Sequence, residues 1–121
     1  MDTSLVEQER RKQARLEKLG TNNPCCCMCP ENDWRTLELH HIAGNGRHEA
    51  TVISCFNCHR KCSDLQKDHP PVDPSANSLL DTIGHYLLGL ADTLKFIVET
   101  LYKFGHALID IAKPQPSGQV V

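Results

Sequence analysis

The sequence lacks three features that would assign it quickly to a broad class of proteins: a surplus of basic charge, an apolar leader and a long uninterrupted hydrophobic run. Its 13 Lys and Arg residues are balanced by 15 Asp and Glu residues. This balance excludes a polycationic protein that binds nucleic acid through net charge alone. Four titratable residues interrupt its most apolar stretch, residues 79–98: Asp81, His85, Asp92 and Lys95. We therefore expect a cytoplasmic protein with no membrane partner.

The cysteine count also argues against a secreted protein. Seven cysteines would leave one thiol unpaired in a disulfide scaffold, so a reducing compartment and metal binding fit the composition better. At 121 residues the chain is long enough for one small domain with an appendage, and too short for two ordinary cores.

Charge is concentrated at the start of the chain. Residues 1–20 carry five basic and four acidic groups, whereas residues 70–121 carry three basic and five acidic groups. Residues 3–19 contain no Gly or Pro, and their composition predicts a charged surface helix. The basic cluster in this helix either follows a DNA backbone or only keeps the helix soluble, and the sequence leaves both readings open.

Local patterns in the middle of the chain predict two strands and a helix. Residues 35–42 alternate apolar and polar side chains as a half-buried strand does, and a β-branched run at 50–54 predicts a second strand. The intervening "AGNGRHE" is typical of a loop. Residues 55–67 favour a helix, which the prolines of residues 70–78 must end.

Residues 79–112 carry the strictest pattern in the chain. Apolar residues recur there at alternating spacings of three and four, and this heptad seam comprises Leu80, Ile83, Leu87, Leu90, Leu94, Ile97, Leu101, Phe104, Leu108 and Ile111. Small residues follow every second seam position and would let another helix approach closely: Gly84, Ala91, Val98 and Gly105. We expect a helix that pairs two copies of the chain as a homodimer. The alternative is a helix, broken near one of its glycines, that folds back onto a domain too small to cover ~50 Å of helix.

Two C-x-x-C pairs form the strongest local signal. Cys26 and Cys29 form one pair, and Cys55 and Cys58 form the other. Each pair can reach one ion from a tight turn, and the intervening strands bring the pairs together, so we expect a structural Zn²⁺ held by four thiolates. Four thiolates leave no open position for water, and chemistry must therefore take place elsewhere.

The remaining cysteines leave one choice open. Cys25 or Cys27 could replace Cys26 in the first pair, since all three lie within reach of the same turn. Cys62 lies one helical turn past the second pair and is interpreted as a spare or core thiol.

Three histidines lie close to these cysteines in the sequence. His40 and His41 are neighbours at the end of the first predicted strand, where alternation directs them to opposite faces. His59 follows the second cysteine pair directly, at the start of the predicted helix. The order C-x-x-C, "ELHHIAGNG", a short strand and "CFNCH" resembles the HNH endonuclease family over residues 25–68. The resemblance implies a ββα-metal fold with two zinc knuckles.

The resemblance also implies a division of labour among these histidines. His41 would be the general base that activates water against a DNA phosphodiester, while His40 and His59 would bind a catalytic divalent metal. Mg²⁺ prefers oxygen ligands, so a metal site with two histidine ligands could also bind Mn²⁺, Ni²⁺ or Zn²⁺. The implied function is a metal-dependent DNA endonuclease, and a dimer would suit cleavage of both strands.

The chain departs from the family pattern at the middle residue of HNH. The family has an asparagine about five residues before the second knuckle, and Ala50 occupies that position here. Asn45, Asn57 and His48 are nearby, but none has the required spacing. The alternative function is therefore a non-catalytic zinc-binding module that binds nucleic acid or a protein partner.

Together these patterns predict an α+β fold with a small zinc-stabilised ββα-metal core between a charged helix and a heptad helix. The expected segments are the charged helix, the zinc-knuckle domain, a proline-rich linker, the heptad helix and a flexible tail, at residues 1–20, 21–69, 70–78, 79–112 and 113–121. Four further histidines are expected to have no role: His48 and His69 in solvated loops, and His85 and His106 on the outer face of the heptad helix.

Overall fold

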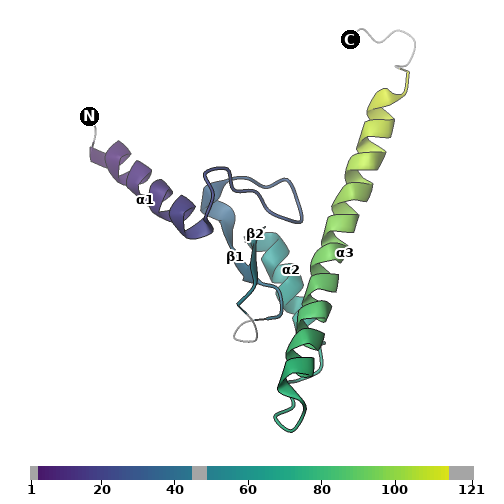
Figure 1. Ribbon diagram of the computed structural model, residues 1–121. Coiled ribbons are helices and arrows are strands. Elements are labelled where there is room, and N and C mark those ends of the chain that lie inside the picture. Colours follow the sequence, from purple (N-terminus) through teal and green to yellow (C-terminus); the bar gives the residue numbers. More distant parts are fainter. Residues whose placement is uncertain (1–2, 45–48, 115–121) are drawn as a thin grey trace.

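The computed structural model describes residues 3–44 and 49–114, which form a mixed α and β fold (Figure 1). Its elements are α1 (Thr3–Leu19), a short 3₁₀ helix η1 (Trp34–Thr36), β1 (Leu37–His41), β2 (Thr51–Cys55), α2 (Phe56–Gln66) and α3 (Ser78–Ala112). The predicted α+β class is confirmed. The predicted interstrand loop is described only in part, because residues 45–48 lie outside the described residues, as do residues 115–121 of the predicted tail.

The first helix is a surface helix, as its composition predicted. Only Leu16 and Leu19 of α1 are buried, and Leu19 joins the core of the domain. Gly20 ends the helix in the left-handed region at φ 80°, where its N–H donates to the carbonyl oxygen of Leu16 at 2.9 Å. The helix is therefore attached to the domain by its last turn.

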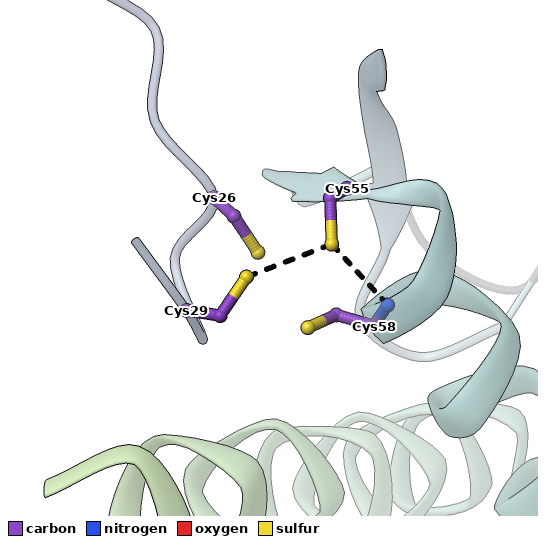
Figure 2. Close-up of side chains that lie close together, drawn as sticks. All are labelled: Cys26, Cys29, Cys55 and Cys58. Atoms are coloured by element: carbon purple, nitrogen blue, oxygen red, sulfur yellow. Dashed lines mark hydrogen bonds between the residues drawn. The ribbon is translucent and has the colours of Figure 1, made fainter. Parts of the chain in front are cut away.

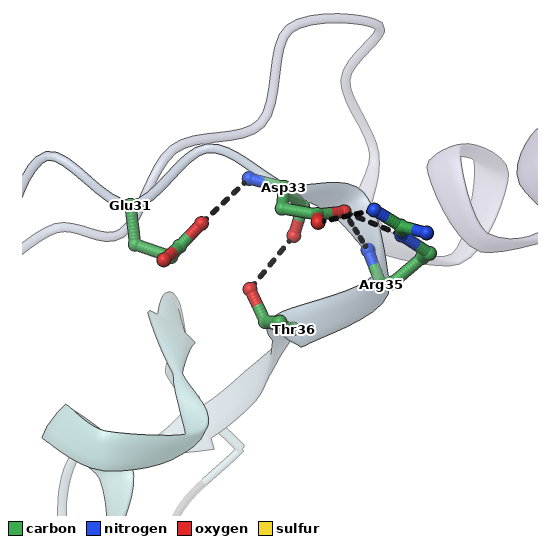
Figure 3. Close-up of polar contacts among 4 residues, drawn as sticks. All are labelled: Glu31, Asp33, Arg35 and Thr36. Carbon is green, nitrogen blue, oxygen red and sulfur yellow. Dashed lines mark hydrogen bonds and ion pairs between the residues drawn. The ribbon is translucent and has the colours of Figure 1, made fainter.

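A network of polar contacts fixes the chain between the first cysteine pair and β1 (Figure 3). The Asp33 carboxylate accepts hydrogen bonds from the backbone N–H of Arg35 at 3.0 Å and from its guanidinium at 2.8 and 3.0 Å. The Thr36 hydroxyl donates to the Asp33 carbonyl oxygen, and Asp33 N–H donates to the Glu31 carboxylate. Glu31 in turn accepts the backbone N–H of Cys26 at 2.8 Å through its carbonyl oxygen. The network thus connects the start of β1 to the first cysteine pair.

The two strands form an antiparallel hairpin whose ends differ in chemistry. Leu37 lies opposite Cys55 at one end of the sheet, and His41 lies opposite Thr51 at the other. β2 runs directly into α2, and the Cys55 sulfur caps that helix by accepting the N–H of Cys58. The sheet and α2 together therefore make a ββα unit.

Cysteine makes up most of the hydrophobic core, which is small. The buried cluster comprises Leu19, Cys26, Met28, Leu37, Cys55, Cys58 and Cys62. A domain with so few buried aliphatic side chains gains little stability from apolar burial alone, and such domains commonly depend on a metal or a cross-link.

The last helix runs unbroken for 35 residues, so the predicted alternative of a break at a glycine is wrong. It packs against the domain through His85, Gly89 and Thr93, which are its buried residues. A Cβ atom on Gly89 would lie 1.6 Å from the carbonyl oxygen of Ile42, so only glycine allows this approach. Further along, the Thr100 hydroxyl donates to the carbonyl oxygen of Met28.

Two histidines expected to be solvated are instead in the contact between α3 and the domain. His69 Nε2 lies 2.7 Å from a carboxylate oxygen of Asp92. His85 is 5% exposed, with Nδ1 2.8 Å from the carbonyl oxygen of Asp81 and Nε2 2.7 Å from that of Pro70. The prediction was wrong because the linker returns α3 to the domain, which the helical pattern alone did not reveal.

Although Ile97 packs against the core, most of the heptad seam takes no part in this contact. Eight of its ten side chains are exposed, and the last turns of α3, residues 101–112, extend away from the domain (Figure 1). Despite this apolar surface, none of the helices in the described ranges is long and apolar enough to cross a membrane.

Candidate metal centre and the adjoining histidines

Four cysteine sulfurs converge where the first knuckle meets the junction of β2 and α2 (Figure 2). Cys26 and Cys29 come from the loop before η1, Cys55 is the last residue of β2, and Cys58 lies in the first turn of α2. Their ligand atoms all lie within 4.8 Å of one another. A tetrahedral zinc with bonds of about 2.3 Å sets its sulfurs about 3.8 Å apart, and the Cys29 and Cys55 sulfurs are 3.6 Å apart. The cluster could therefore hold one zinc ion.

The two knuckles hold their sulfurs by similar backbone contacts. The N–H of Met28 donates to the Cys26 sulfur at 3.4 Å, and the N–H of Cys58 donates to the Cys55 sulfur at the same distance. The N–H of Cys27 donates to the carbonyl oxygen of Ile53 at 2.9 Å, which joins the first knuckle to β2. The sulfurs are thus held by the backbone of the loop and of the sheet.

Without a metal ion, the surroundings of the cluster favour the thiolate form of Cys26 and disfavour that of Cys29 and Cys58. Burial disfavours the Cys26 thiolate, but backbone hydrogen bonds from Cys55, Met28 and Cys29 outweigh it and lower the pKa of Cys26. Burial raises the pKa of Cys29 and of Cys58. A divalent ion would favour the thiolate form of all four residues, so its binding must release protons.

The structure also shows which of Cys25, Cys26 and Cys27 belongs to the first pair, a choice that the sequence left open. Cys25 is exposed, and its thiol is directed at the backbone carbonyl oxygens of Cys26 and Cys29. Burial raises the pKa of Cys27 to about 12, which keeps that residue a thiol. Cys26 is the member of the first pair that joins the cluster. Cys62 is a core thiol, as interpreted from the sequence, and lies 3.6 Å from the Met28 sulfur.

The predicted metal-binding histidines meet on the side of β1 that faces α2. The ring centroids of His40 and His59 are 4.8 Å apart with their planes at 61°. Glu38, two residues before His40 in the strand, hydrogen-bonds Nδ1 of His59. His41 is half-exposed at the end of the strand, where alternation directs it away from this face. Glu38 was missed by the sequence analysis, although its spacing from His40 was a signal that could have identified it.

His40 is a buried polar residue of the site whose ring makes no hydrogen bond in the described structure. It is 1% exposed, and neither of its ring nitrogens has a hydrogen-bond partner within the described part of the chain. Burial, with the nearby His59 and His41, lowers the pKa of His40 to about 4, so its ring is neutral near pH 7. A neutral imidazole with a free nitrogen is a metal ligand, and leaving such a group buried without a partner costs about 1–3 kcal/mol.

The histidines bring together fewer potential metal ligands than the four cysteines do. Across residues 3–44 and 49–114, the four cysteines are the only group of three or more His, Cys, Asp or Glu residues whose ligand atoms converge on one ion. A shallow depression of about 380 Å³ borders His59, and its lining residues are Glu38, Phe56, Asn57, His59, Arg60 and Ser63. The depression gives the histidine face access to solvent.

The backbone beside His41 is held without the asparagine of the HNH pattern. The N–H of Ile42 donates to the carbonyl oxygen of Ala50 at 3.2 Å, and Gly89 of α3 packs against the carbonyl of Ile42. Asn45 and His48, two of the nearby candidates, lie outside the described residues. Asn57, the third, is exposed in α2.

Comparisons with protein-family models, curated proteins and solved structures found no match to the chain. The function of the site is therefore argued from its own residues.

Proposed function

We propose that the protein is a metal-dependent endonuclease of the HNH type, which hydrolyses DNA phosphodiester bonds beside a structural Zn²⁺ site. The observation that carries the proposal is His40, a buried neutral imidazole with no hydrogen-bond partner in the described structure, which lies beside His59. The four-cysteine cluster is at the junction of β2 and α2, so it supports the helix that bears His59 and the strand that pairs with β1, which bears His40. His41 is next to His40 but on the other face of the strand.

The donor set fits a divalent ion. His40 and His59 would hold it, and the hydrogen bond that His59 Nδ1 donates to the Glu38 carboxylate would leave Nε2 as the free nitrogen of that ring. When bound, the ion would neutralise negative charge on the phosphate and on the departing 3′ oxygen. Two imidazole ligands suit Mn²⁺ or Ni²⁺ as well as Mg²⁺.

His41 supplies the base in this proposal. Its imidazole takes a proton from water as the water oxygen forms a bond to phosphorus, and the bond from phosphorus to the 3′ oxygen breaks. The 3′ oxygen then takes a proton from solvent, so the products carry a 3′ hydroxyl and a 5′ phosphate. Arg60, which lines the depression beside His59, is placed to contact a neighbouring phosphate.

A non-catalytic zinc-binding module is the second candidate. Ala50 in place of the HNH asparagine favours it, because the base could then lack a partner that orients it. Such a module would bind nucleic acid or a protein through the same face without cutting. The two candidates differ in whether a phosphodiester bond is broken.

Plasmid cleavage tests the proposal. Zinc-loaded protein is incubated with supercoiled plasmid and Mg²⁺, Mn²⁺ or Ni²⁺, and conversion to the nicked form is followed over time. We expect the parent to nick and His41→Ala to be about 10²- to 10⁴-fold slower, since that is the usual contribution of a general base. DNA ligase should reseal the nicks, because the products carry a 3′ hydroxyl and a 5′ phosphate.

His106→Ala is the matched control, since it removes an exposed histidine on α3 far along the chain from the site. It should nick at the parent rate, and all three proteins should hold the same amount of zinc. If the parent binds DNA but nicks it with none of the ions, the non-catalytic candidate replaces the nuclease. Equal rates for the parent and His41→Ala would remove His41 from the mechanism.

A further inference from the structure

We propose that the heptad seam of α3 binds the same seam of a second copy of this chain, which makes the protein a homodimer. This inference does not depend on the nuclease proposal. Eight of the ten seam side chains are 45–74% exposed: Leu80, Ile83, Leu87, Leu94, Leu101, Phe104, Leu108 and Ile111. The other two, Leu90 and Ile97, are half-buried.

The seam is exposed because α3 uses a different face to contact its own domain. The buried residues of that contact, His85, Gly89 and Thr93, lie off the seam, and one half-buried seam residue, Ile97, packs against the core beside them. Beyond Thr100, which hydrogen-bonds Met28, every residue of α3 is exposed. The contact within one chain therefore leaves eight of the ten seam side chains exposed.

The size of this surface matches a dimer interface better than it matches a monomer. The exposed parts of these eight side chains amount to roughly 700–900 Å², whereas the largest apolar patch on a typical monomer is about 300–600 Å². A standard stable interface buries about 800 Å² on each partner. One seam thus offers the area that one side of such an interface needs.

The distribution of charge on α3 favours a second copy over other occupants. The seam and the small residues beside it carry no charged group, so two identical faces can meet without opposing like charges. The remaining positions of α3 hold four acidic residues, Asp81, Asp92, Glu99 and Asp110, against two basic residues, Lys95 and Lys103. Helices that lie on anionic membranes are rich in Lys and Arg on the polar face, whereas this helix has more acidic than basic residues there.

The shape of the exposed face also suits a helix as its partner. Gly84, Ala91 and Gly105 recur beside the seam, with open space around both glycines. A shallow apolar groove of about 440 Å³ lies over Gly105 and is lined by Val98, Leu101, Tyr102, Gly105, His106 and Ile109. Side chains of a facing helix insert into such holes in coiled-coil packing.

The mass of the full-length protein in solution tests the proposal. Sedimentation equilibrium from about 1 to about 100 µM should give twice the chain mass of 13.6 kDa, with the dimer favoured at high concentration. The double variant Leu101→Glu, Leu108→Glu puts two charges on the projecting part of the seam and should weaken self-association at least tenfold, by about 1.4 kcal/mol.

Lys103→Glu is the matched control. It changes the net charge by the same two units on the same stretch of α3, but off the seam, and should remain dimeric. Zinc content measured on each variant shows that its domain is folded. The proposal is overturned by a parent of 13.6 kDa at every concentration, or by a double variant that still dimerises like the parent. A monomeric parent that sediments with vesicles of phosphatidylcholine and phosphatidylglycerol would instead identify a lipid surface as the occupant.

Discussion

His40 shows how a single buried residue connects the fold to the chemistry of the site. The residue is almost completely buried, and both of its ring nitrogens lack a hydrogen-bond partner in the described structure. Burial lowers its pKa to about 4, whereas an imidazole in an unfolded chain titrates near ~6.5. The neutral ring is the form that a metal ligand requires, and the folded chain must exclude a proton to keep it.

This pKa shift makes stability depend on pH. Between about pH 6.5 and pH 4 the unfolded chain binds a proton at His40 that the folded chain does not, so stability falls as the pH falls. From pH 7 to pH 5 the loss from this residue should be on the order of 2 kcal/mol in the free energy of unfolding. Urea unfolding at pH 7, 6 and 5, at fixed zinc concentration, measures it.

His40→Asn is the informative variant, because an amide does not titrate in this range. The quantity to compare is the change in its free energy of unfolding with pH, which should be smaller than in the parent. His106→Asn removes an exposed histidine and should keep the parent slope. Zinc content is checked at each pH, since acid also displaces zinc from thiolates. Equal slopes for the parent and His40→Asn would contradict the neutral buried state.

Residue spacing predicted the candidate site only in part. It predicted three of the four cysteines of the cluster without ambiguity, but Cys25, Cys26 and Cys27 could each reach an ion from the same turn. The choice depends on backbone contacts such as the one between Met28 N–H and the Cys26 sulfur, which no spacing records. The contact of His40 with His59 could be expected from the predicted ββα order, while the hydrogen bond between His59 Nδ1 and the Glu38 carboxylate is seen only in the structure.

Among the elements, α3 shows most clearly what a periodic pattern can and cannot predict. The alternation of three and four predicted the helix, and the structure contains it over Ser78–Ala112. The pattern could not predict which face meets the domain, because that face contains His85, Gly89 and Thr93 and has no apolar repeat. Close backbone approach, buried hydrogen bonds and the side chains of Phe96 and Ile97 make this contact, and of these only Ile97 belongs to the apolar repeat.

Gly89→Ala tests the docking of α3. Alanine favours a helix by about 1 kcal/mol over glycine, but its Cβ atom would meet the carbonyl oxygen of Ile42 at 1.6 Å. The helix or the backbone after His41 must move, and we expect a net loss of about 1–3 kcal/mol in stability, with a lower midpoint of thermal unfolding.

Gly84→Ala provides the comparison for that variant. No atom lies within 4 Å of a Cβ placed on Gly84, so this substitution should raise the unfolding midpoint through helix propensity alone. If both variants gain stability, α3 does not make the close approach to Ile42 in solution.

For the molecule as a whole, the four-cysteine cluster joins segments that are far apart in the sequence. Cys26 and Cys29 belong to the loop that follows α1, whereas Cys55 and Cys58 lie at the junction of β2 and α2. α3 lies close to the cluster in the close-up and docks on the same small domain (Figure 2). Because most of the core residues are cysteines, we infer that a bound ion contributes much of the folding free energy.

The zinc content of purified protein is the most direct test of this metal centre, on which both the fold and the proposed function depend. We expect one zinc per chain in the parent and in Cys25→Ser, whose thiol lies outside the cluster. Cys26→Ser should lose the ion and unfold, because three thiolates and a hydroxyl hold zinc far more weakly than four thiolates. A parent without zinc after purification with the ion present, or a Cys25→Ser protein that loses it, would contradict the account.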